Sequence, residues 1–175
     1  MTNPDKVRVQ AQASIADVEL EKLEKDFMRF NIAYCACLDD DRLEDWPSFF
    51  PEDGRYLIQS RENLDAGFEG AYWVYYISQG MMRDRVTSLR HINTFNHHYY
   101  RHQISNLRIL SVNDGVYEVR TNYSVVQTTF EGKLQSTNVG EYRDQIYIDN
   151  GKALFKEKLV VPDTFHTESA IVYPL

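Results

Sequence analysis

The second half of the chain is a series of strand-forming segments separated by tight turns. The turns are NDG, EGK and DNG, and the Asp-Gly and Asn-Gly pairs among them are strong signals for β-hairpins. Between the first two turns, apolar and polar residues alternate, with Tyr117, Val119, Tyr123 and Val125 on one face. Such alternation is typical of a strand with one buried face. We therefore expect strands at 101–110, 116–130, 137–148 and 153–161, paired as an antiparallel meander.

A helical pattern precedes these strands. From Ser14 onward, apolar residues recur at alternating spacings of three and four, which places them on one stripe of a long helix. The stripe comprises Leu20, Leu23, Phe27, Phe30, Tyr34 and Cys37. The segment LDDDRLEDWPSFF then predicts a second, short helix that turns Trp46 and Phe49 inward, its length limited by Pro47. Strands are expected at GRYLIQSR and AYWVYYIS, and a short helix at MMRDRVTSLR.

Helices first and antiparallel strands afterwards is the order of an α+β fold. The simplest arrangement is a cone-shaped fold like that of nuclear transport factor 2. In such a cone, the N-terminal helices pack in the concave face of one long, curved, antiparallel or mixed sheet. The sequence has no internal repeat and no low-complexity linker. We expect a flexible N-terminal arm at 1–13 and a single cone-fold domain at 14–175.

Charge and cysteine usage exclude several classes of protein. The net charge of −7 argues against binding to nucleic acid or to an anionic membrane, both of which attract clustered Lys and Arg. No run approaches the roughly 18 apolar residues needed to span a bilayer, and the first residues do not resemble a signal peptide. Cys35 and Cys37 point in different directions on a helix, which disfavours a disulfide, and a metal half-site would lack its second half. We expect a cytoplasmic protein with two reduced thiols.

Four of the five histidines gather in HINTFNHHYYRH, namely His91, His97, His98 and His102. Imidazole is a common metal ligand, but His97 and His98 are adjacent and must face opposite ways on a strand. No Asp or Glu occurs between residues 91 and 105, so a two-His-one-carboxylate iron site would need its acid from elsewhere. We expect no metal here and interpret the histidines as polar packing.

Glu157 is the acid most open to a catalytic interpretation. It shares parity with Phe155 and Leu159 in the last strand, so we expect it to point into the cone. Burial there would raise its pKa and let it act as a general base. The favoured alternative is a structural ion pair with an inward arginine such as Arg90 or Arg101.

Several segments together resemble the β (small) subunit of aromatic ring-hydroxylating (Rieske-type) dioxygenases. YCACLDDDRLEDWPSFFPEDGRYLI resembles the early motif of that family, in which an acid, an arginine and a Trp-containing turn precede the first strand. MMRDRVTSLR resembles its Asp-Arg helix, YRHQISNLRI its Arg-His strand, and FKEKLVVPDT its closing strand. The chain departs from the family in its last hairpin, where DNGKALF stands in place of a turn that often carries Trp.

The resemblance implies a small, mainly structural subunit of the terminal oxygenase component of a multicomponent dioxygenase. Such a complex carries out NADH-driven hydroxylation of an aromatic acid, here one like benzoate, salicylate or terephthalate. In this family the Rieske [2Fe–2S] cluster and the mononuclear Fe(II) belong to the α (large) subunit, and NADH acts through a reductase. The chain would then carry no catalytic, cofactor-binding or metal residue and would have no activity alone.

The resemblance also implies partners: the α subunit, and further β subunits in a β trimer, within a hexamer of three α and three β. Arg101 and His102 are adjacent and face opposite sides of one strand, so at most one of them points into the cone. Interface or structural roles are expected for Asp84, Arg85, Arg101, His102 and Trp46.

A second hypothesis comes from a different class of protein. A stand-alone cone-fold dehydratase or isomerase would use Glu157, His91 or His102 with Tyr34 for acid–base chemistry. A small-ligand-binding protein would instead use the cone as a pocket. Turnover by the purified chain, compared with turnover in the presence of a large subunit, would separate these functions.

Overall fold

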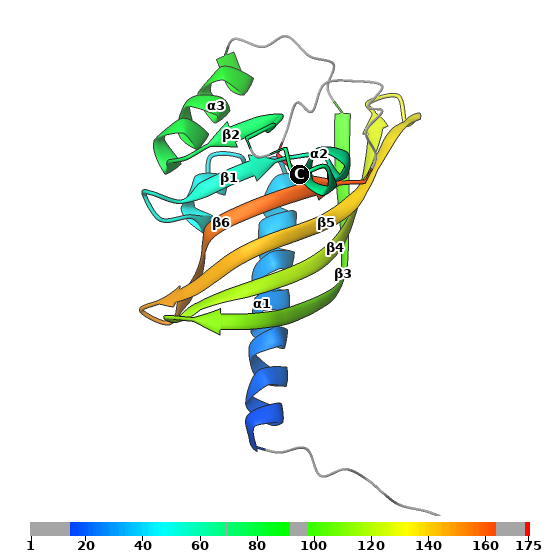
Figure 1. The fold of residues 1–175 in the computed structure, drawn as a ribbon. Coiled ribbons are helices and arrows are strands. Elements are labelled where there is room, and N and C mark those ends of the chain that lie inside the picture. Colours follow the sequence, from blue (N-terminus) through cyan, green and yellow to red (C-terminus); the bar gives the residue numbers. More distant parts are fainter. Residues whose placement is uncertain (1–14, 69, 92–97, 164–173) are drawn as a thin grey trace, which may run out of the picture.

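One curved sheet of six strands wraps around a long helix (Figure 1). The computed structural model describes residues 15–68, 70–91, 98–163 and 174–175. The strands are β1 (Arg55–Ile58), β2 (Val74–Tyr76), β3 (His98–Asn113), β4 (Val116–Thr129), β5 (Leu134–Asp149) and β6 (Lys152–Pro162). Their order across the sheet is β2-β1-β6-β5-β4-β3. The β1–β6 pair is parallel and the other four pairs are antiparallel, so the predicted α+β cone with a mixed sheet is confirmed.

Helix α1 (Ile15–Asp39) lies in the concave face of the sheet. Its apolar stripe is confirmed from Leu23 onward, because Leu23 packs against the core and Phe27, Tyr34 and Cys37 are buried in it. Leu20 is exposed, contrary to the stripe, because the first turns of α1 extend past the narrow end of the sheet (Figure 1). Residues 18–22 of the helix are therefore exposed, and the helix packs against the sheet from Leu23 onward.

The helix expected after α1 and the first two strands are shorter than the sequence predicts. The expected helix at 38–50 is a single 3-10 turn, η1 (Trp46–Phe49). The aromatic run AYWVYYIS contributes only β2, and Trp73 and Tyr75 are exposed because β2 is an edge strand. Two helices also lie in this region: α2 (Arg61–Asp65), which the sequence did not indicate, and α3 (Gln79–His91), which confirms the helix predicted at MMRDRVTSLR.

Trp46 is fully buried, as the sequence predicts. Its ring makes edge-on contacts with Phe50, Tyr56 and Tyr76 at centroid distances of 6.2, 5.2 and 6.4 Å. Edge-to-face contacts of this kind add to the free energy gained by burying the rings. Trp46 thus joins η1 to the short β1–β2 side of the sheet.

The predicted direction of Glu157 is wrong. A register shift between β5 and β6 pairs Ile146 with Phe155 but Gln145 with Glu157, so one extra residue on β6 reverses its alternation. Lys158 therefore points into the cone, and Glu157 points outward to an ion pair with Arg55 at 3.0 Å. The favoured alternative, an ion pair, is correct in kind, but its partner is neither Arg90 nor Arg101.

Candidate functional site: the interior and mouth of the cone

A buried ion pair lies in the interior of the cone. The ammonium of Lys158 on β6 donates to both carboxylate oxygens of Asp144 on β5, at 3.2 and 3.1 Å, and to the amide oxygen of Asn31 on α1 at 3.4 Å. Both charged side chains are 0% exposed. A buried ion pair is tolerated only when further hydrogen bonds satisfy it, and Asn31 supplies one of them.

Aromatic rings surround the Lys158 ammonium. It lies 3.6 Å from the ring centroid of Tyr142, 4.4 Å from that of Phe155 and 4.7 Å from that of Tyr34, which adds cation–π attraction. Desolvation lowers the pKa of Lys158 and raises that of Asp144 to about 6, and the attraction between the two opposes both shifts. The pair is an anchor for α1, β5 and β6.

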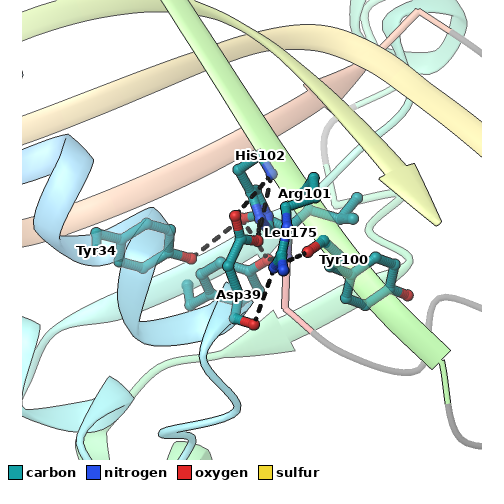
Figure 2. Close-up of polar contacts among 7 residues, drawn as sticks. Tyr34, Asp39, Tyr100, Arg101, His102 and Leu175 are labelled. Carbon is teal, nitrogen blue, oxygen red and sulfur yellow. Dashed lines mark hydrogen bonds and ion pairs between the residues drawn. The ribbon is translucent and has the colours of Figure 1, made fainter. Parts of the chain in front are cut away.

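A second carboxylate, Asp39, lies at the mouth of the cone (Figure 2). Its Oδ1 is 2.6 Å from Nδ1 of His102, and its carboxylate accepts from the backbone N–H of His102 at 3.0 Å. Arg101 donates to the backbone carbonyls of Asp39 at 3.4 Å and Tyr100 at 2.9 Å. The His102 side chain is 0% exposed and Arg101 is exposed, so only His102 points into the cone.

The carboxylates of α1 also cap the free edge of the sheet. β3 is an edge strand, and its outward N–H groups at His102 and Ile109 donate to Asp39 and Glu24. A long edge strand with unpaired backbone groups invites pairing with another chain. Asp39 and Glu24 satisfy two of these groups and fix α1 along the edge.

Leu175 closes the interior from the mouth. Its carbonyl oxygen accepts from the hydroxyl of Tyr34 at 3.1 Å, and its N–H donates to the hydroxyl of Tyr56 at 2.8 Å (Figure 2). The Leu175 side chain is buried in the hydrophobic core. Burial raises the pKa of Tyr34 well above its ordinary value, so its hydroxyl stays protonated and serves as a donor.

The Asp39–His102 pair is the arrangement best suited to acid–base chemistry, because the carboxylate orients the imidazole. Among the described residues, Nε2 of His102 is buried and has no hydrogen-bond partner. Solvent does not reach this ring. The dyad therefore joins β3 to α1.

The other expected site residues lie apart from this cluster. His91 ends α3 and is exposed, as is Asp84 on the same helix, whereas Arg85 is half-buried. His97 lies outside the described residues. Within the described ranges, no group of three or more His, Cys, Asp or Glu residues could hold a metal ion.

Both cysteines are free and buried. Desolvation raises the pKa of the Cys35 thiol to about 12 and that of Cys37 to about 11, so neither is a reactive thiolate at neutral pH. The part of the chain that the structure describes contains no helix long and apolar enough to cross a membrane.

The Lys158–Asp144 pair was missed at the level of sequence. Asp144 shares parity on β5 with Tyr142 and Ile146, which are wholly buried. An acid in phase with two apolar residues indicates an inward carboxylate that needs a cation. The signal for Asp144 was therefore present, whereas the inward direction of Lys158 depends on the bulge in β6.

Comparisons with known proteins agree with this architecture. The family model described as "Ring hydroxylating beta subunit" matches residues 35–165. The chain is 39% identical over 142 residues to the small subunit of anthranilate 1,2-dioxygenase from Burkholderia cepacia, covering 81% of this chain and 88% of that one. It is 32% identical over 146 residues to a β subunit of the terminal oxygenase component of terephthalate 1,2-dioxygenase from Comamonas sp., covering 83% and 94%.

A solved structure extends the likeness to three dimensions. The β subunit of a candidate aromatic-ring-hydroxylating dioxygenase from Novosphingobium aromaticivorans superimposes with a TM-score of 0.78 at 34% identity, covering 89% of this chain and 98% of that one. Fold, family motif and sequence identity over most of the length coincide. The chain therefore belongs to the family of ring-hydroxylating dioxygenase β subunits.

Proposed function

We propose that this chain is the small subunit of the terminal oxygenase of a dioxygenase that hydroxylates an aromatic acid. The observation that carries the proposal is the family match over residues 35–165. Relatives at 39% and 32% identity belong to dioxygenases named for anthranilate and terephthalate, both aromatic carboxylates. Benzoate-like acids, including salicylate, are the substrate class we propose, and the cytoplasm is the proposed location.

In this proposal the chain acts by assembly and does not touch substrate. Leu175 and the aromatic side chains occupy the cone interior, and the Asp39–His102 pair at its mouth is engaged in holding the fold. Iron and the Rieske cluster would reside in the large subunit, reduced by NADH through a separate reductase. The proposed assembly is a hexamer of three large and three small subunits.

The test is reconstitution. The large subunit is produced with and without this chain, and hydroxylation of benzoate, salicylate, anthranilate and terephthalate is measured alongside mass by light scattering. We expect the two subunits to co-purify and turnover to need both. Turnover by this chain alone, or undiminished turnover by the large subunit alone, would contradict the proposal.

Substitutions at two exposed residues, Arg101 and Asp84, provide a finer test of the same proposal. Arg101 is exposed and bonds only carbonyls in the described structure, and a planar guanidinium is well suited to an interface. We expect Arg101→Ala, and Asp84→Ala on exposed α3, to weaken the assembly before any chemical step changes. An Arg101→Ala complex of normal mass and stability but without turnover would indicate a direct catalytic role instead.

A further inference from the structure

Three arginines form a row across the outer, convex face of the sheet. Arg108 on β3 stands directly opposite Arg120 on β4, and Arg120 stands directly opposite Arg143 on β5. These strands are neighbours in the sheet (Figure 1). Like charges opposite each other on adjacent strands destabilise a sheet, so the fold alone gives no reason for this row.

Compensation within the chain is incomplete. Glu141 is 2.6 Å from Arg143, 3.2 Å from Arg61 and 3.7 Å from Arg120. One carboxylate thus serves three guanidinium groups, and among the described residues only Arg61 has a further acid, Asp163 at 3.0 Å. Arg108 is exposed and makes no ion pair with any described residue. A positive surplus remains around Glu141, although the whole chain carries −7.

The row borders a hollow on the outer face of the sheet. A depression of about 180 Å³ is lined by Arg120 and Arg143 together with the acids Glu118, Asp144 and Glu157, with Leu110 and Leu159 at its sides. Leu110 is exposed. The lining thus holds both signs of charge, and the arginine row contributes its two cations.

A surface of opposite charge lies elsewhere on the same chain. The loop that follows α1, residues 39–45, has the sequence DDDRLED, with five acids and one arginine. Arg42 and Arg90 are the arginines that pair with these acids through side chains. The acid surplus therefore persists at the mouth of the cone.

The same acidic loop adjoins an aromatic platform. A hollow of about 330 Å³ is lined by residues that include Asp39, Asp41, Tyr99 and Phe130. The rings of Tyr99 and Phe130 stack at 6.2 Å and are 50% and 69% exposed. Acids beside exposed aromatic faces form a favourable surface for guanidinium groups.

We propose that the arginine row of one copy binds the acidic loop of the next copy, and that this contact closes the ring of small subunits. A contact between two different patches of one chain is heterologous, and heterologous contacts generate closed rings when the rotation between copies closes. The proposal rests on the proposed function, because it names the surfaces that hold the expected trimer. The occupant of the arginine row is thus a second copy of this chain.

The experiment is a charge swap within the reconstituted oxygenase. Arg108→Glu with Arg120→Glu reverses the row, and Asp40→Lys with Asp45→Lys reverses the loop. We expect each pair to weaken the ring of small subunits at least tenfold, measured by native mass spectrometry on dilution. All four changes together should restore it to within threefold. Arg29→Glu, on the exposed face of α1 in a pair with Asp26, is the matched control and should leave the ring unchanged.

Loss of fold is distinguished from loss of contact by the melting temperature. The row variant exchanges two facing arginines for two facing acids and loses the contact of Arg120 with Glu141, but it places an acid opposite Arg143. The row variant should therefore melt close to the wild type. The wild-type ring should also loosen as salt rises from about 0.05 to about 0.5 M, since salt screens exposed charges.

An unchanged ring in either charge-reversal pair, or no recovery in the combined variant, would overturn the proposal. So would a row variant that keeps its ring but releases the large subunit, which would assign the arginine row to that partner. If the wild-type chain neither forms a ring nor supports turnover with the large subunit, the proposed function itself fails. If the complex is active and its ring is unchanged by the charge reversals, this inference is wrong but the proposed function stands.

Discussion

Two of the three acids of strand β5, Glu141 and Asp144, lie three residues apart and experience opposite environments. Asp144 faces the interior, fully buried, with Lys158 as its cation. Glu141 faces outward, 11% exposed, with three arginines around it. Burial would raise the pKa of both acids; that of Asp144 is raised to about 6, whereas the arginines lower that of Glu141. The balance between desolvation and nearby cations therefore decides whether the pKa of each acid rises or falls.

The comparison separates two uses of charge in one sheet. Inside, one acid matches one base, and both are sealed among aromatic rings. Outside, bases outnumber acids around Glu141, and the surplus is accessible to a partner. We infer that the inner pair serves the fold and that the outer cluster serves association, and the two should respond differently to mutation, pH and salt.

The largest effect is expected from breaking the inner pair. Lys158→Met leaves Asp144 buried without its cation, and losing one partner of a buried pair costs about 3–5 kcal/mol. Urea unfolding at pH 7 provides the measurement. Lys158→Met with Asp144→Leu removes both charges and should recover to within about 1 kcal/mol of the wild type, since apolar replacement of such pairs is often neutral. A single variant as stable as the wild type would contradict the burial of this pair.

Trp46→Ala provides an apolar comparison within the same core. The ring is fully buried against Phe50, Tyr56 and Tyr76, and truncating a core aromatic costs about 3–5 kcal/mol. Differential scanning calorimetry should therefore show a lowered melting temperature. An unchanged value would mean that Trp46 makes only weak contacts.

The pH dependence of these two losses should differ. The pKa of Asp144 is about 6 when folded, above its ordinary 3.8, so the folded state binds more protons between these values. The stability this group contributes is present below about pH 4 and is lost as pH rises through about 6. Without Lys158 the pKa of Asp144 should rise further.

Consequently, the free energy lost in Lys158→Met should shrink by at least half between pH 7 and pH 5, because a neutral carboxyl needs no cation. The loss in Trp46→Ala should stay constant over the same range. Urea unfolding of both variants and the wild type at each pH gives the comparison. Parallel pH dependence in the two variants would mean that Asp144 does not control the effect.

Local periodicity predicted most of the architecture. The stripe on α1 and the alternation on β4 each follow from one element's own contacts with the core, so sequence spacing is enough to identify them. The three turns of the meander could be predicted from the turn residues alone. Asp114 and Asn150, at two of these turns, adopt positive φ, as tight hairpin turns demand. These features do not depend on any distant part of the chain.

The site depended on features that are not local. The inward direction of Lys158 follows from one extra residue in β6 opposite β5, which a period-2 pattern cannot reveal. Leu175 reaches Tyr34 across 141 residues of sequence, and the arginine row exists only through the register of three strands. Conversely, the strand predicted over the whole of AYWVYYIS is wrong in length. An aromatic run predicts a strand, but it does not tell whether that strand lies at the centre or at the edge of a sheet.

The smallest effect on the fold is expected outside, at Glu141. Glu141→Gln removes the carboxylate shared by Arg61, Arg120 and Arg143, which leaves like charges in contact at a partly solvated surface. We expect a loss of about 1.5–2 kcal/mol, at the low end of the range for hydrogen bonds to charged groups. Because the remaining repulsion is screened by salt, the loss should fall as salt rises, whereas the loss in Lys158→Met should not.

The contribution of Glu141 to stability changes with pH in the opposite direction to that of Asp144. Arginine contacts hold the pKa of Glu141 below its ordinary 4.5, so its contribution is present above that value and is lost as pH falls through the lower, folded pKa. The Glu141→Gln loss should therefore decrease only at acid pH, whereas the Lys158→Met loss already decreases between pH 7 and 5. Urea unfolding across pH and salt measures both trends. A Glu141→Gln loss as large and as insensitive to salt as that of the inner pair would mean that both faces of β5 serve the fold alone.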